Sequence, residues 1–134
     1  MRYSMDFNHE RIREEKAITI YSKISNGSFQ KLGPTDIDYK MFDKDGRLMS
    51  YVEVVPRMKN ISVAYPLSIS ARMLLKLVDK KHNPVVVWAC DDGIIYGSVS
   101  VLVGEIRFSY LQSGTYDLWV YYERQKGLKY IRYV

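Results

Sequence analysis

Hydrophobic residues recur at helical spacing in residues 8–24 and again in residues 68–80. The apolar face of the first stretch consists of Ala17, Ile20, Tyr21 and Ile24. The stripe of the second consists of Ile69, Met73, Leu74, Leu77 and Val78. Asn26-Gly27 supplies a stop signal for the first stretch, and Ser68 can serve as an N-cap for the second. The spacing therefore predicts two amphipathic helices.

Apolar and polar residues alternate in residues 36–43 and 48–55, on either side of Asp45-Gly46. This pattern predicts a β-hairpin with one apolar face and one acidic face. A two-residue Asp-Gly loop would pair Lys44 with Arg47. The register that follows sets Tyr39 opposite Val52, Lys40 opposite Tyr51 and Asp38 opposite Glu53.

The rest of the chain reads mainly as strands. Residues 84–89 form a continuous apolar run that is typical of a strand buried on both faces. Strand character resumes in residues 94–103, and residues 61–64 are a further short candidate. The tyrosine-rich tail, residues 105–134, suggests a hairpin between residues 116–123 and 128–133. This order predicts a single α/β (α+β) domain over residues 1–134.

Composition narrows the possible chemistry. The hydrophobic fraction is 47% and the charged fraction 26%, as in ordinary globular proteins, and the net charge of +5 permits nucleic-acid binding. A single cysteine, Cys90, excludes an internal disulfide and is expected to be a buried thiol. No apolar run reaches the roughly 18 residues that span a bilayer, and no signal peptide is evident. We expect a cytoplasmic protein without a membrane partner.

The opposed carboxylates of Asp38 and Glu53 are the strongest candidate for chemistry. Directly opposed residues on one sheet face have Cβ atoms roughly 4.5–5.5 Å apart, and like charges there destabilise the sheet. A divalent cation between them would remove that cost and supply catalytic chemistry. The alternative without a functional site is a solvent-exposed hairpin on an unrelated α/β domain, in which Lys40 offsets the repulsion between the two carboxylates.

The order of these elements and acids resembles the PD-(D/E)XK nuclease superfamily. The residues that carry the resemblance are Asp38 in TDIDYKMFDKDG, Glu53 in YVEVVPR, and a first-helix glutamate. The resemblance covers about residues 8–97 and is nearest to the small phage-borne and Holliday-junction-resolvase-like members. It implies a restriction-endonuclease-like core, helix–strand–strand–strand–helix–strand, with an added C-terminal β-hairpin. It also implies Mg²⁺ (or Mn²⁺) at Asp38 and Glu53, DNA as substrate, and the host cytoplasm as location if the chain is phage-encoded.

The family motif has a lysine two residues after the glutamate, and here that position is Val55. Lys40, on the face of Asp38, is the candidate to replace it. Among Glu10, Glu14 and Glu15, helical phase favours Glu14 as the assisting acid. A basic groove for nucleic acid is predicted from Arg57, Lys59, Arg72 and Lys76.

The missing lysine leaves a second class of function open, a catalytically inactive nuclease fold that binds nucleic acid or a protein partner. The tail offers a second nucleic-acid surface, because its basic residues alternate with tyrosines on which bases can stack. The same tyrosines fit sheet packing or a homodimer interface.

Overall fold

The computed structural model describes residues 2–34 and 36–134, with side chains from residue 9 onward in the helix that begins the chain. It has an α+β fold, as predicted from the sequence. The helices are α1 (Arg2–Ile24) and α2 (Ala71–Asp79). The strands are β1 (Ser28–Lys31), β2 (Tyr39–Phe42), β3 (Leu48–Pro56), β4 (Leu67–Ser70), β5 (Pro84–Ala89), β6 (Gly93–Ser98), β7 (Glu105–Tyr110), β8 (Tyr116–Tyr122) and β9 (Lys129–Arg132).

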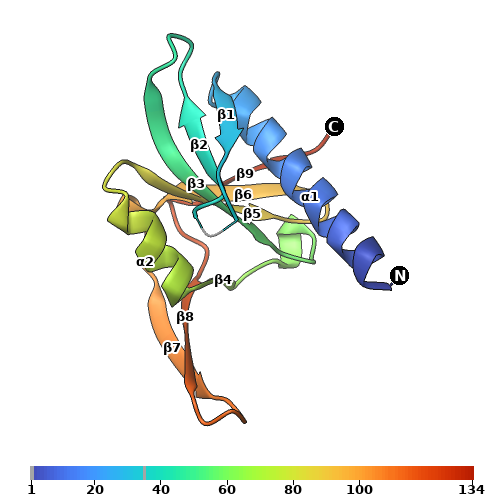
Figure 1. Cartoon of the computed structure of the whole chain (residues 1–134), viewed down its shortest axis with the longest axis vertical. Helices are drawn as coiled ribbons and strands as arrows, with labels where there is room; N and C mark the ends of the chain where they lie inside the picture. Colours follow the sequence, from blue (N-terminus) through green and yellow to red (C-terminus); the bar gives the residue numbers. More distant parts are fainter. Residues whose placement is uncertain (1, 35) are drawn as a thin grey trace.

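Six strands form the main sheet, in the order β1-β2-β3-β5-β6-β9. The neighbours β3 and β5 are parallel, whereas the other pairs in this sheet are antiparallel. A smaller sheet has the order β4-β8-β7. Figure 1 shows α1 along one side of the main sheet and α2 near the smaller sheet, with β7 and β8 projecting away from the body. We call the segment Glu105–Tyr122 the arm.

The main sheet is buried on both faces. On the α1 side, Ala17 and Ile18 pack with Tyr39, Met41 and alternate valines of β3 and β5. On the other side, Leu77 of α2 and the smaller sheet pack over Val86, Trp88 and Ile95. The predicted stripes are correct only in part: Ala17 and Leu77 are buried as expected, but α1 also buries Ile18, and Ile24 and Val78 are each 38% exposed. β5 is the doubly buried strand that the apolar run predicted.

The β2–β3 turn differs from the predicted one. Asp43, not Lys44, faces Arg47, and the two are joined by a backbone hydrogen bond of 2.8 Å from Asp43 N–H to Arg47 O. The loop therefore has three residues, with Gly46 at φ +79°. The register then shifts between Met41 and Phe42, and this bulge restores the predicted alignment of Tyr39 with Val52 and Lys40 with Tyr51.

Five other expectations are corrected. Residues 28–31, for which no regular element was predicted, form β1, and the candidate strand at 61–64 contains a 3-10 helix, Ile61–Val63. The second helix begins at Ala71 because residues 67–70 pair with β8 as β4. Residues 99–101 form another 3-10 helix. The tail contains a hairpin, but β8 pairs with β7, while β9 joins β6 in the main sheet.

No helix within the described residues combines the length and the hydrophobicity that crossing a bilayer requires.

Candidate carboxyl-pair site

Asp38 and Glu53 meet where β2 begins and β3 approaches its end. Asp38 directly precedes β2, and its backbone N–H donates to Glu53 Oε1 at 3.2 Å. The backbone N–H of Val54 donates to Asp38 Oδ2 at 2.9 Å. Each side chain thus accepts a hydrogen bond from the opposite segment, which fixes both carboxyl groups. The juxtaposition predicted from the hairpin register is present.

The pair is shielded from solvent. Glu53 is only 6% exposed, so it does not lie on a solvated face of the hairpin. Burial, together with the charge of Asp38, raises the pKa of Glu53 to about 8. Burial also raises the pKa of Asp38, although the hydrogen bond from Val54 opposes this increase. The hydrogen bond between the two carboxyl groups favours a proton on Glu53, as expected when like charges share a site.

A second polar cluster flanks the pair from the α1 side. Glu14 Oε1 accepts hydrogen bonds from Lys31 Nζ at 2.7 Å and from the Tyr39 hydroxyl at 2.9 Å. The charge of Glu14 raises the pKa of both Asp38 and Glu53, and the charge of Lys31 lowers that of Asp38. Burial tends to lower the pKa of Lys31, but the hydrogen bond and charge of Glu14, with the charges of Asp38 and Glu53, raise it overall. Lys31 therefore carries a positive charge beside the acids.

Small cavities open on both sides of the last residues of β3. Glu53 lines a cavity of about 190 Å³, which also contains Val55 and Trp119. Glu14 lines one of about 90 Å³, together with Arg13. Val54 and Pro56 border both cavities. Glu14 and Glu53 therefore reach the same end of the strand from opposite faces of the sheet.

The structure does not bring Lys40 to the carboxyl groups. Its Nζ lies 5.9 Å from the centre of the Tyr51 ring, and in the described chain it forms no ion pair with Asp38 or Glu53. The lysine whose charge affects the carboxyl pair is Lys31, on β1, because its positive charge lowers the pKa of Asp38. The sequence alone does not point to Lys31, because β1 has one apolar residue, Phe29, and shows no hydrophobic alternation.

The four residues of the predicted basic groove are scattered. Arg57 is half-buried, and its Nε donates to the Ala64 carbonyl at 2.8 Å, so it holds a loop in place. Lys59 is exposed in that loop. Arg72 and Lys76 are exposed on α2, and neither lines the cavity beside Glu53. A continuous groove formed by these four side chains is not observed.

The donor set fits a hard divalent cation bound by few protein ligands. Within residues 2–34 and 36–134, no group of three or more His, Cys, Asp or Glu side chains is arranged as a metal cage. Mg²⁺ typically keeps several waters and uses only one or two carboxylates together with substrate phosphates. Asp38 and Glu53 are two adjacent carboxyl groups, and burial raises the pKa of both, so they meet that requirement.

Comparison with known proteins adds no relative: no family model, curated protein or solved structure matches this chain.

Proposed function

We propose that this protein is a Mg²⁺-dependent endonuclease of the PD-(D/E)XK type that cleaves DNA phosphodiester bonds. The observation that carries the proposal is the pairing of the half-buried Asp38 with the buried Glu53 near the end of β3, where each carboxyl group accepts a hydrogen bond from the opposite backbone segment. Buried like charges are costly unless a cation or proton compensates them. The chain order of α1, β1, β2, β3, α2 and β5 also follows the order of the nuclease core. Such an enzyme would act in the cytoplasm.

In this proposal Asp38 and Glu53 would hold the cation. When bound, Mg²⁺ would lower the pKa of a water nucleophile and offset charge on the phosphate. The backbone N–H groups of Asp38 and Val54 keep the carboxyl groups oriented without movement during the reaction. Lys31 stands in for the motif lysine, and because its pKa is raised it acts as a fixed positive charge rather than as a base.

The direct test is cleavage of supercoiled plasmid DNA with Mg²⁺, Mn²⁺ or EDTA. Asp38→Asn keeps an oxygen that can accept from Val54 N–H but removes the charge, so we expect the protein to fold and the cleavage rate to fall at least about a hundredfold. Asp45→Asn is the matched control, because Asp45 is exposed in the hairpin loop and should be neutral. Unchanged cleavage by Asp38→Asn, with calorimetric Mg²⁺ binding also unchanged, would reject the assignment.

The inactive alternative is favoured by one observation: Val55, at the motif-lysine position, faces the apolar cavity beside Glu53 with Ile69, Met73 and Trp119. The methylene groups of a lysine at this position would lie along these apolar side chains. Val55→Lys separates the alternatives. If the natural chain binds DNA without cutting it and Val55→Lys gains Mg²⁺-dependent cleavage, the natural protein is a disarmed binding module. If the natural chain already cuts DNA, the alternative is excluded.

We also propose that two copies associate through the arm. Cross-strand partners on one face form an apolar ladder, which consists of Ile106–Val120, Phe108–Leu118 and Tyr110–Tyr116. Phe108 is 67% exposed and Leu118 47%. β4 pairs with β8 only at residues 119–122, so the outer part of the arm has two strands, and a two-stranded hairpin alone is only marginally stable in water. The arm contains one arginine and two acids, so its net charge is −1 in a chain of net charge +5. A second copy can therefore meet this face without the repulsion of the remaining surface.

A further inference from the structure

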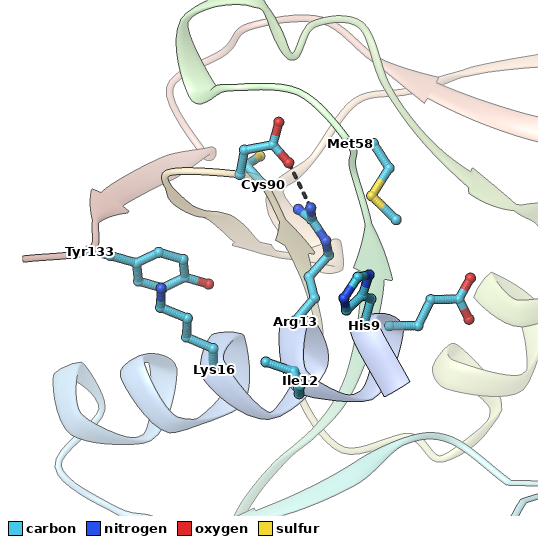
Figure 2. Close-up of a pocket in the computed structure, with 9 residues that line it drawn as sticks. His9, Ile12, Arg13, Lys16, Met58, Cys90 and Tyr133 are labelled. Atoms are coloured by element: carbon cyan, nitrogen blue, oxygen red, sulfur yellow. Dashed lines mark hydrogen bonds and ion pairs between the residues drawn. The ribbon is translucent and has the colours of Figure 1, made fainter. Parts of the chain in front are cut away.

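A cavity of about 510 Å³ lies between α1, the β3–η1 loop, the β5–β6 turn and the C-terminal segment. Here η1 is the 3-10 helix Ile61–Val63. Figure 2 shows the side chains of Arg13 and Lys16 rising from α1 toward the turn and the C-terminal segment. The volume of this cavity lies within the range of small-molecule pockets, roughly 300–1,000 Å³.

Arg13 is held rigidly at the centre of this cavity. Its Nη1 donates to the Ala89 carbonyl at 3.2 Å, and its Nη2 donates to Asp91 Oδ1 at 2.7 Å. A guanidinium has five N–H donors, so three remain after these two bonds. An arginine whose geometry is already fixed loses little entropy when it binds a planar or tetrahedral anion.

Tyr133 adds an unpaired donor. Its hydroxyl oxygen is the one buried side-chain N or O atom without a hydrogen-bond partner among the described residues. In Figure 2 this hydroxyl points from the ring toward Arg13. Lys16 Nζ lies 4.2 Å from the centre of the same ring. The hydroxyl, the guanidinium and the ammonium group thus converge on one part of the cavity, where an acceptor oxygen would satisfy the tyrosine.

The rest of the cavity wall is apolar. Two acidic side chains in the wall offset part of the positive charge, so a ligand with several negative charges would bind poorly. Ile12 and Met58 line the cavity and are 60% and 55% exposed. Asp91 is paired with Arg13, and Glu10 also lines the space, so the cavity is not a strongly positive well. A ligand with one anionic group and a flat apolar body fits this combination better than a bare polyanion does. A nucleotide unit of a DNA strand has that chemistry.

The cavity also borders the small cavity that contains Glu14, on the α1 side of β3. Glu10 and Arg13 line both this space and the small cavity of about 90 Å³ that contains Glu14, Val54 and Pro56. A strand bound at Arg13 can therefore extend along the α1 side of β3 as far as Glu14. A base in a duplex is stacked and paired, so it would have to leave the helix to enter the cavity, at a cost of unstacking.

We propose that this cavity binds one unpaired nucleotide of the substrate strand. The phosphate contacts Arg13, Lys16 and the Tyr133 hydroxyl, and the base lies against Ile12 and Met58. The inference deepens the proposed function, on which it rests, by naming the substrate class: DNA with a single-stranded segment. It predicts a preference for single strands, because every base has a face that can stack on an apolar or aromatic wall.

The test is binding of a fluorescent oligothymidylate and of a duplex of equal length, measured by anisotropy in EDTA. We use Asp38→Asn as the background, so that neither the metal nor cleavage enters the measurement. We expect the single strand to bind at least about tenfold more tightly than the duplex. Lys16→Gln and Tyr133→Phe should each weaken single-strand binding about three- to tenfold. Lys23→Gln, an equal charge change at an exposed position of α1, is the matched control.

Equal binding of duplex and single strand would overturn the inference, as would equal losses for Lys16→Gln and Lys23→Gln, which would indicate nonspecific attraction. Tyr133→Phe removes only the hydroxyl, so unchanged binding by this variant would also contradict the proposed contact. These outcomes are separate from those for the nuclease proposal. A protein that selects single strands in EDTA but never cuts DNA would retain the nucleotide pocket and lose the catalytic assignment.

Discussion

Globular proteins usually bury apolar side chains and expose charged ones. The end of β3 buries a carboxyl group, whereas the arm exposes aromatic side chains. In the body of the protein, Glu53 is a carboxyl group with 6% exposure, next to a second acid. In the arm, Phe108 and Tyr110 are aromatic side chains with 67% and 66% exposure. Folding alone favours neither arrangement, because buried charges and large exposed apolar patches both cost free energy.

Under the two proposals above, each region is completed by something outside the isolated chain. The acids would share a cation, and without one the raised pKa of Glu53 indicates a proton on that residue. The apolar ladder would be covered by a second copy of the chain. The two requirements can be separated experimentally, because the arm and the carboxyl pair contribute to different sheets.

The largest effect expected is a pH dependence of stability without metal. The folded protein keeps the Glu53 proton up to a pKa of about 8, whereas the unfolded chain releases it near the ordinary value of 4.5. Between these values the folded state binds more protons, so the free energy of unfolding falls as pH rises. We expect a decrease on the order of 2–4 kcal/mol between pH 5 and pH 8, measured by urea unfolding in EDTA.

Glu53→Gln should remove most of this slope and make the metal-free protein more stable than wild type at pH 8, while abolishing stabilisation by Mg²⁺. Glu123→Gln, at an exposed position of the tail, should leave the slope unchanged. Saturating Mg²⁺ should stabilise wild type more at pH 8 than at pH 5, because binding requires ionised carboxylates. Stability that rises from pH 5 to pH 8 in EDTA would contradict the protonated state of Glu53.

The next effect concerns the arm. Phe108→Glu places a charge in the apolar ladder, so we expect the dimer dissociation constant to rise at least about tenfold and the light-scattering mass to approach that of one chain. Gln112→Glu adds the same charge in the turn between β7 and β8, away from the ladder, and should leave the mass unchanged. Neither variant should alter the pH dependence of unfolding at the carboxyl pair. A wild-type protein with the mass of one chain at high concentration would rule out this assembly.

The hairpin shows how a register can be predicted correctly from a wrong turn. The three-residue loop shifts the pairing by one residue, and the bulge near Met41 shifts it back. The prediction held because only one register keeps Tyr39, Met41 and Val52 on the buried face. Core packing, rather than the turn, therefore decides the alignment that sets Asp38 beside Glu53.

The strands that pair with β8 and the position of Lys31 could not be predicted from hydrophobic alternation. A short loop between β8 and β9 suggested a hairpin, but the two strands belong to different sheets. Which edge a strand joins depends on contacts between distant segments, and alternation within the strand does not encode them. Lys31 lies on an exposed edge strand with one apolar side chain, Phe29, so neither its strand nor its approach to Glu14 leaves a periodic signal.

The smallest effect expected distinguishes the two lysines. Lys31→Met removes a positive charge that lowers the pKa of Asp38, whereas Lys40→Met removes a positive charge near the Tyr51 ring. If Lys31 stabilises charge on the reacting phosphate, cleavage should slow roughly tenfold in Lys31→Met, equivalent to about 1.4 kcal/mol, and less than about twofold in Lys40→Met. Mg²⁺ binding, measured by calorimetry, should instead tighten a few-fold in Lys31→Met because a competing cation is gone. A merely structural role for Lys31 would weaken both cleavage and Mg²⁺ binding, and a larger loss in Lys40→Met would restore the lysine that the sequence favoured.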